Sequence, residues 1–310
     1  MSDLALKTSS ERRRFYLREP AIAVMFLIPA FIGLLIFLYY PIVQTIIYSF
    51  FDLDHTTRWL QEPFVWFENY ADVIKSEQFW LSLRFTLLFS VSSVFLQFWI
   101  GMALAMSTFW VLSRLRGVLR AIIIIPWAIP QIIQASMWKW LYNTDVGLIG
   151  DLLTRSGLVD SPPLFLADPN LAMVSVVLAH VWKASAVTSI FLMAGLAMVP
   201  DHLHDAAKVD GARAWMRFWH ITLPMMTPTI LVTLLFRTMD AIRTFDIIYG
   251  LTGGGPGTTT DVLSSFAYKY YFKFVKYGSG SAYAMVTFFL VMALSLLYMK
   301  KIQPHLAFRK

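Results

Sequence analysis

The chain has 310 residues, of which 57% are hydrophobic and 15% are charged, and its formal net charge is +7. Because soluble domains carry roughly 25% charged residues, this composition excludes an ordinary soluble protein and predicts an integral membrane protein. The sequence contains no cysteine, which excludes disulfides, thiolate metal sites and a cysteine nucleophile.

Six apolar runs are long enough to cross a membrane, which takes about 20 residues as a helix. The first run is too long for the core of a signal peptide and lacks a cleavage pattern, so we expect a retained anchor. The sequence therefore predicts an all-α membrane protein with six transmembrane helices in residues 21–301, after an N-terminal segment 1–20 and before a tail 302–310. The predicted spans are residues 21–48, 80–107, 118–141, 171–198, 222–248 and 282–301.

Lys and Arg are distributed unequally between the two sides of this arrangement. Fifteen of the 26 lie in residues 1–20, in the loops at residues 108–120 and 199–221, and in residues 300–310, whereas six lie in the opposite loops. Cytoplasmic segments are the richer ones in Lys and Arg, so both termini are predicted to be cytoplasmic. The positive charge thus reflects topology, and we expect no nucleic-acid partner.

Tryptophan lies near the ends of several predicted spans, where aromatic side chains anchor helices at the membrane surface. We expect such belts from Trp80, Trp110, Trp127 and Trp140, and keep a sugar-stacking surface as the alternative. In the third span, Pro126 and Pro130 flank Trp127. Proline kinks buried membrane helices, so this span is expected to bend.

Charged residues recur every three positions in the fifth predicted span. They are Arg237, Asp240, Arg243 and Asp246. Charges within a bilayer usually face a cavity or pair with one another. Helical spacing places Arg237, Asp240, Ala241 and Thr244 on one face. Two interpretations stay open: a polar face on a substrate cavity, and a salt-bridge ladder along the helix.

Other patterns of binding or catalytic chemistry are weak. Four histidines lack the spacing of a metal site, and we expect them to be solvated or interfacial: His180, His202, His204 and His220. The glycine-rich residues 251–258 lack a following Lys-Ser/Thr and a preceding strand, which favours a flexible turn over a phosphate loop. We expect no catalytic residue, no metal site and no ATPase activity in this chain.

A polar segment, residues 200–224, separates the fourth and fifth apolar runs. Asp201 and Asp205 lie where a helix N-terminus favours negative charge. Gly211 can end that helix because it has no Cβ. The segment is therefore predicted to form a short helix, a glycine bend and the start of a second helix on the cytoplasmic side.

This segment resembles the EAA loop of the membrane subunits of bacterial ATP-binding-cassette importers, which docks on the cytoplasmic ATPase. Asp205 stands where the family usually has Glu. The matching residues, which the resemblance implies couple the chain to an ATPase, are Asp205, Ala206, Ala207, Asp210, Gly211, Ala212, Phe218, Ile221, Leu223 and Pro224.

Further motifs extend the resemblance to the sugar permeases of that family, of the maltose and trehalose type. Asn69-Tyr70, Phe79-Trp80 and Thr86 are similar to a segment of their first outer loop, although Phe85 replaces the usual asparagine. The other matching segments are residues 125–130, 138–142, 181–183 and 243–256.

The resemblance implies an importer permease (MetI-like) fold in a bacterial or archaeal inner membrane, surrounded by lipid. It also implies a heterodimer with a second permease subunit, two ATPase subunits that bind ATP and Mg²⁺, and an extracytoplasmic sugar-binding protein. This chain itself would bind no cofactor. The substrate path would be lined by Lys183, Ala184, Val187, Arg237, Asp240, Ala241 and Thr244.

The implied activity is ATP-driven uptake of a di- or oligosaccharide, with glycerol-3-phosphate or a related solute as the alternative substrate. Outside the family, an ion-coupled secondary transporter is less favoured, because no repeat relates the two halves. In a channel or scaffold, the third option, the Arg and Asp pairs would be structural.

Overall fold

The computed structural model describes residues 19–54, 63–111 and 113–307. These residues form helices and connecting loops without any β-strand, so the expected all-α architecture is confirmed for the described chain. Most of the predicted N-terminal segment 1–20 and the end of the tail 302–310 lie outside the described residues.

Helices occupy each of the predicted spans, but not every span is a single helix of membrane-spanning length. Four are long and apolar enough by themselves, and two bent pairs qualify if each pair is one span. The long ones are Val24–Tyr48, α5 (Glu77–Trp110), α9 (Pro169–Leu196) and α16 (Tyr277–Ala307). The pairs are α6 (Arg116–Ala128) with α7 (Gln131–Leu141), and Ala214–Met225 with α13 (Thr227–Ile242). Six crossings therefore stay a prediction.

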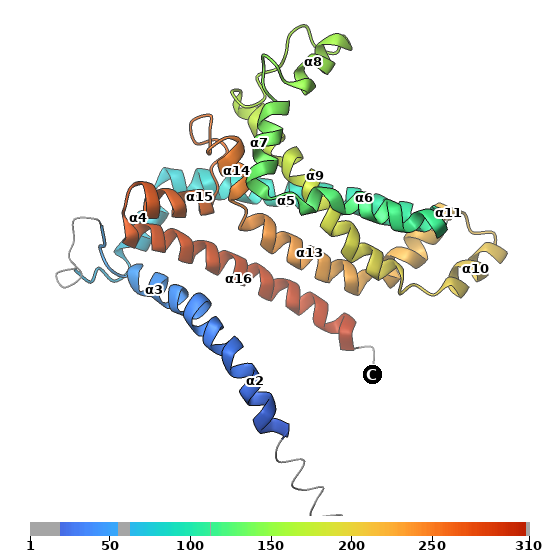
Figure 1. Ribbon diagram of the computed structural model, residues 1–310, viewed down its shortest axis with the longest axis horizontal. Coiled ribbons are helices and arrows are strands. Elements are labelled where there is room, and N and C mark those ends of the chain that lie inside the picture. Colours follow the sequence, from blue (N-terminus) through green and yellow to red (C-terminus); the bar gives the residue numbers. More distant parts are fainter. Residues whose placement is uncertain (1–18, 55–62, 112, 308–310) are drawn as a thin grey trace, which may run out of the picture.

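The bundle is built on α5, α9, α13 and α16, which run beside one another (Figure 1). A Cβ added at Gly101 of α5 would lie 2.9 Å from Cγ2 of Thr188 on α9. The glycine therefore lets these two long helices approach closely, as small residues do in membrane bundles.

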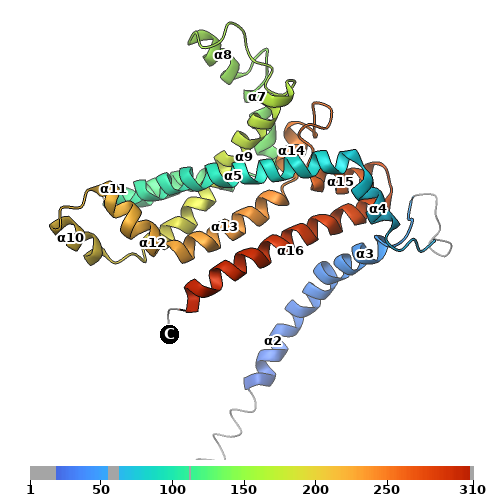
Figure 2. The same ribbon diagram turned by 180° about the vertical axis from the view of Figure 1, so that it is seen from behind.

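The first membrane helix is a nearly free-standing rod of three parts: α2 (Glu19–Leu34), the π-helical turn η1 (Leu35–Tyr39) and α3 (Tyr40–Tyr48). Its α3 part packs on α16, whereas α2 stands away from the bundle in both views (Figures 1 and 2). In the most hydrophobic 18-residue stretch of this rod, no residue is buried within the chain. This surface must be covered by lipid or by another subunit.

Shorter helices fill the connections. They are α4 (Glu68–Lys75), η2 (Ser113–Leu115), α8 (Leu148–Arg155), α10 (Asp201–Val209), α11 (Ala214–Arg217), η3 (Phe218–Thr222), α12 (Leu223–Met225), α14 (Asp246–Leu251), α15 (Leu263–Tyr268) and η4 (Lys269–Lys273). Helix α8 lies at the tip of a projection from the bundle, and α10 lies at the far end of the long helices (Figure 1).

Two predicted spans are interrupted. The expected bend in the third span is confirmed and amounts to 91° between α6 and α7. Ile129 and Pro130 are extended there, because the ring of a proline disfavours helical backbone in the residue before it. The fifth span was expected to reach residue 248, but α13 ends at Ile242 and α14 begins a separate helix.

Two side chains just beyond the end of α13 bond back to its last turn. The Thr244 hydroxyl donates to the Asp240 carbonyl over 3.0 Å, and Nε of Arg243 donates to the Met239 carbonyl over 3.2 Å. The Thr244 hydroxyl thus satisfies the Asp240 carbonyl at the helix end, whereas the Met239 carbonyl also accepts the backbone N–H of Arg243. The chain then turns and starts α14.

The residues of the first-loop motif hold the ends of several helices together. Nδ2 of Asn69 donates to the carbonyls of Ser49 (3.1 Å) and Phe51 (2.9 Å). The Thr86 hydroxyl of α5 accepts a hydrogen bond from the backbone N–H of Leu263 at the start of α15. Their roles in this chain are therefore structural.

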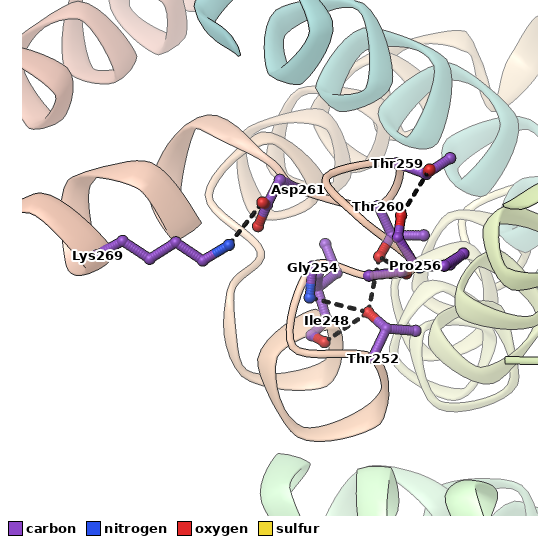
Figure 3. A network of polar contacts seen from close by, with 9 residues as sticks. Ile248, Thr252, Gly254, Pro256, Thr259, Thr260, Asp261 and Lys269 are labelled. Atoms are coloured by element: carbon purple, nitrogen blue, oxygen red, sulfur yellow. Dashed lines mark hydrogen bonds and ion pairs between the residues drawn. The ribbon is translucent and has the colours of Figure 1, made fainter. Parts of the chain in front are cut away.

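The glycine-rich loop after α14 forms turns, as expected, and hydrogen bonds between its own residues hold them. The Thr252 and Thr260 hydroxyls lie 2.7 Å apart, and the Thr260 hydroxyl also donates to the Gly255 carbonyl (Figure 3). Gly254 has a φ of +95°, and a Cβ there would lie 1.9 Å from Oδ1 of the buried Asp261. Only glycine fits this position.

Candidate functional site

A polar cavity of about 380 Å³ lies where the break between α6 and α7 faces α9 and α13. Its lining residues are Trp127, Gln131, Gln134, His180, Lys183, Ala184, Val187, Arg237 and Asp240. Five of the seven residues expected along a substrate path therefore line one cavity, and they come from two helices that are far apart in the sequence.

The other two expected path residues do not line this cavity. Ala241 is almost completely buried in an apolar cluster with Phe89 and Ile248. Thr244 lies beyond the end of α13, with its hydroxyl bonded to the Asp240 carbonyl. The helical-face argument failed for Thr244 because it assumed a helix that continues to residue 248. It failed for Ala241 because that residue packs in the apolar cluster with Phe89 of α5 and Ile248 of α14.

Four lining residues were missed as candidates. His180 is only 6% exposed and its ring packs 5.0 Å from that of Phe89, so the expectation of a solvated or interfacial histidine is wrong. Trp127 lies at the helix break instead of at a span end. Gln131 and Gln134 could have been found, because they are amides spaced three apart inside an apolar run, directly after Pro130.

The predicted salt-bridge ladder is reduced to one pair in the described chain. Nη1 of Arg237 lies 3.5 Å from Oδ2 of Asp240, and the side chains are 14% and 50% exposed. The guanidinium also lies 5.9 Å from the ring centre of Phe191, a cation–π distance. Arg243 is exposed and bonds to a backbone carbonyl. The pair is thus part of the cavity wall, with its carboxylate on the open side.

Two hydrogen bonds tie the α6–α7 region to α9 beside the cavity. Nζ of Lys183 donates to the Ile129 carbonyl in the break. Nε2 of Gln134 donates to the Ala179 carbonyl. Both bonds cross between helices, so they fix one wall of the cavity relative to another.

The lining suits a ligand rich in hydroxyl groups. Arg237 and the glutamine amides can donate hydrogen bonds, and Asp240 can accept them. Trp127 offers an aromatic face. Convergent polar groups that can fix the orientation of a ligand are typical of small-molecule sites.

The segment 200–224 has the predicted course of helix, glycine bend and second helix. Helix α10 ends at Val209, and Gly211 has a φ of +78°. Backbone N–H groups of Gly211 and Ala212 donate to the Lys208 and Ala207 carbonyls over 3.0 and 2.8 Å. This is the pattern with which glycine closes a helix.

Helix α10 has one side toward the bundle and one side away from it. Asp201, His204 and Lys208 line a cleft of about 620 Å³ between α10 and the ends of α5 and α9. Val209 is 89% exposed. The Lys208 amine donates to Asp205 over 2.8 Å, which holds the pKa of that carboxyl below its usual range.

The second half of the segment is fastened to the bundle. Phe218 is buried in a cluster with Met102, Leu192 and Met226. Of the ten predicted coupling residues, Asp205, Ala206, Asp210, Gly211 and Pro224 are exposed, Ala207, Ala212, Ile221 and Leu223 are half-buried, and Phe218 is buried. The exposed ones are accessible to a partner on the α10 side.

The described part of the chain holds no cluster of three His, Asp or Glu side chains suited to a metal ion. The two features of interest are therefore the polar cavity and the exposed surface of α10. The cavity is lined by α6, α7, α9 and α13, whereas α10 lies at the far end of the long helices (Figure 1).

Comparison with known proteins gives a consistent result. The family model described as "Binding-protein-dependent transport system inner membrane component" matches residues 97–306. The chain is 40% identical to the trehalose/maltose transport system permease protein MalF of Thermococcus litoralis, over 91% of this chain and 94% of that protein. It is 35% identical to the sulfoquinovosyl glycerol transport system permease protein SmoG of Agrobacterium fabrum, over 93% and 92%.

A solved structure agrees with these relatives. The structure of a bacterial alginate ABC transporter, in complex with an alginate pentasaccharide-bound periplasmic protein, contains a chain with a TM-score of 0.78 and 25% identity. The match covers 91% of this chain and 94% of that one.

Proposed function

Because this chain belongs to the family of binding-protein-dependent transport system inner membrane components, as a permease subunit of a sugar ABC importer, we propose that its polar cavity is part of the sugar path. The chain is a multi-pass membrane protein and, as a member of a transport family, is not an enzyme. The substrate class we propose is a di- or oligosaccharide.

The observation that carries this proposal is the gathering of Lys183, Ala184, Val187, Arg237 and Asp240 around one cavity. Burying charges and amides within a membrane bundle is costly unless they line a cavity or meet partners. Their donors and acceptors match the hydroxyl groups of a sugar. We infer that Gln131, Gln134, His180 and Trp127 belong to the same path.

The proposed coupling element is residues 200–224, with α10 as the contact to a cytoplasmic ATPase. The exposed side of α10 and the glycine bend that ends this helix support this role. Phe218 packs against α5 and α9, and this contact connects the segment to the membrane helices. ATP-driven movement of α10 would pass through Phe218 to α13, the helix that carries Arg237 and Asp240. ATP and Mg²⁺ would bind to the partner subunits.

We further propose six crossings with both termini in the cytoplasm of a bacterial or archaeal cell. The partners would be a second permease subunit, two ATPase subunits and a sugar-binding protein. The largely uncovered α2–α3 rod supports contact with lipid or a second permease, and the solved relative was captured with a periplasmic protein.

Uptake by the assembled complex in vesicles tests the proposal. The complex would be reconstituted with its binding protein, with ATP inside the vesicles, and offered labelled trehalose, maltose, sulfoquinovosyl glycerol or glycerol-3-phosphate in turn. We expect uptake of at least one glycoside that needs both ATP and the binding protein. Uptake driven by an ion gradient without ATP would contradict the importer mechanism, and uptake of glycerol-3-phosphate alone would replace the proposed substrate class.

A further inference from the structure

The break between α6 and α7 creates a problem for backbone hydrogen bonding at the cavity. Helix α6 ends at Ala128, and Ile129 and Pro130 are extended with ψ of 126° and 140°. The last carbonyls of a helix have no backbone donor, and within a membrane bundle such groups must find donors on neighbouring helices, side chains or ordered water. Pro130 has no N–H to contribute.

Lys183 supplies a donor at this point. Its amine comes from α9 and bonds to the Ile129 carbonyl, just beyond the end of α6. The C-terminus of a helix carries partial negative charge, so an ammonium group there is favourable. Among the described residues Lys183 forms no salt bridge of its own, which leaves the helix break as its main partner.

A second bond holds the other side of the break. Gln134 is buried, and its amide donates to the Ala179 carbonyl of α9, four residues before Lys183. On the far side of α7, a Cβ added at Gly250 of α14 would lie 2.6 Å from Cβ of Ala135. The start of α7 is thus held between α9 and α14, and Gln131 and Gln134 project from it into the cavity lining.

We propose that Lys183 is a positioning residue, which ties the α6–α7 break to α9 and thereby sets the place of Gln131 and Gln134 in the cavity. This inference rests on the proposed function only in assigning the cavity to a sugar. Lys183 then acts on transport through the wall that it holds, and not as a ligand of the sugar.

A distance measurement tests this without any substrate. This chain has no cysteine, so spin labels can be placed on it through cysteines introduced at the exposed Ser136 of α7 and Leu178 of α9. In the assembled complex, Lys183→Met should broaden the distance distribution between them and Lys183→Arg, which keeps a cationic donor, should restore a narrow one. Lys139→Met removes an exposed lysine from α7 and is the matched control, expected to leave the distances unchanged.

Uptake kinetics supply the second readout, with the glycoside that the wild-type complex transports. We expect Lys183→Met to raise KM about tenfold, with a smaller change in kcat, and Lys183→Arg to recover most of the loss. A narrow, unchanged distance distribution in Lys183→Met together with impaired uptake would overturn the proposal and make Lys183 a direct ligand. Should Lys183→Met not assemble, Lys183→Gln and Gln134→Leu should each broaden the same distances, and unchanged distances in both would equally overturn it.

Discussion

The amine of Lys269 donates a hydrogen bond of 2.6 Å to Oδ2 of Asp261, a carboxylate that is completely buried (Figure 3). Burial raises the pKa of Asp261, and the hydrogen bond from Lys269 opposes part of that rise. The other oxygen, Oδ1, is buried without a hydrogen-bond partner. The pair therefore joins the glycine-rich loop to the end of α15 with Lys269 as the only cation bonded to this carboxylate in the described chain.

The first prediction is that Lys269→Met destabilises the folded subunit. Removing one partner of a buried ion pair typically costs about 3–5 kcal/mol, because the remaining charge is left unpaired. Without Lys269 the pKa of Asp261 in the folded state should rise further above its unfolded value. The folded variant then binds the extra proton more readily, so its stability should increase as the pH falls and decrease as the pH rises through that pKa.

Thermal unfolding of the purified complex at about pH 5 and about pH 8 measures this effect. Lys276→Met, an exposed lysine of the same region, is the control. Asp261→Asn combined with Lys269→Met should remove most of the pH dependence. A Lys269→Met variant as stable as the control at both pH values would show that the pair is not needed for the fold.

The second prediction separates backbone conformation from side-chain contact in the coupling segment. No heavy atom lies within 4 Å of a Cβ built on Gly211, so its φ of +78° is the constraint. A left-handed conformation costs roughly 1–2 kcal/mol for most residues, whereas Asn adopts it routinely. We expect complexes that carry Gly211→Val to hydrolyse ATP with little sugar uptake, and complexes that carry Gly211→Asn to stay coupled. The measurement is the amount of sugar taken up per ATP hydrolysed. Equal values in the two variants would show that the glycine bend is not needed for coupling.

The third prediction concerns the orientation in the membrane. A cysteine at Thr258 in the glycine-rich loop should react with a membrane-impermeant thiol reagent added to intact cells. A cysteine at Val209, which is well exposed on α10, should react only after the cells are made permeable. Both side chains are exposed in this chain, and the cells should express the permease without the ATPase subunits that are proposed to cover α10. The opposite pattern would invert the proposed topology.

Much of the fold could be predicted from the sequence, because apolar length determines where membrane helices lie and Gly211 and Pro130 have strong local preferences. The cavity could be predicted only in part. Spacing along one helix identified Arg237 and Asp240, but it placed Thr244 on the same face without knowing that α13 stops at Ile242. Charge spacing and apolar periodicity do not reveal where that stop falls. His180 was missed because its burial depends on how α9 packs against α5.

The last prediction decides whether Arg237 and Asp240 serve the sugar or only each other. Their exposures differ: the arginine is 14% exposed and the carboxylate 50%. If the pair is mainly structural, this difference in exposure predicts which of the two single substitutions impairs assembly more. Asp240→Ala would leave a mostly buried guanidinium with only the Phe191 ring beside it, and a broken buried pair typically costs several kcal/mol. Arg237→Ala would leave a half-exposed carboxylate that water in the cavity can solvate, so it should assemble better.

If the pair binds the sugar, assembly should be near normal in both variants and uptake should fall. A hydrogen bond between a charged group and a sugar hydroxyl is worth roughly 1.5–3 kcal/mol, which is about ten- to a hundredfold in affinity. Combining both substitutions then distinguishes the cases, because removing both charges should restore assembly lost for structural reasons but cannot restore a lost contact to the sugar. Assembled complex and initial uptake rate would be measured for both single variants and the double variant. Recovery of uptake in the double variant would favour the structural role, whereas full assembly with persistently low uptake would favour the sugar contact; normal values in all three would exclude both roles.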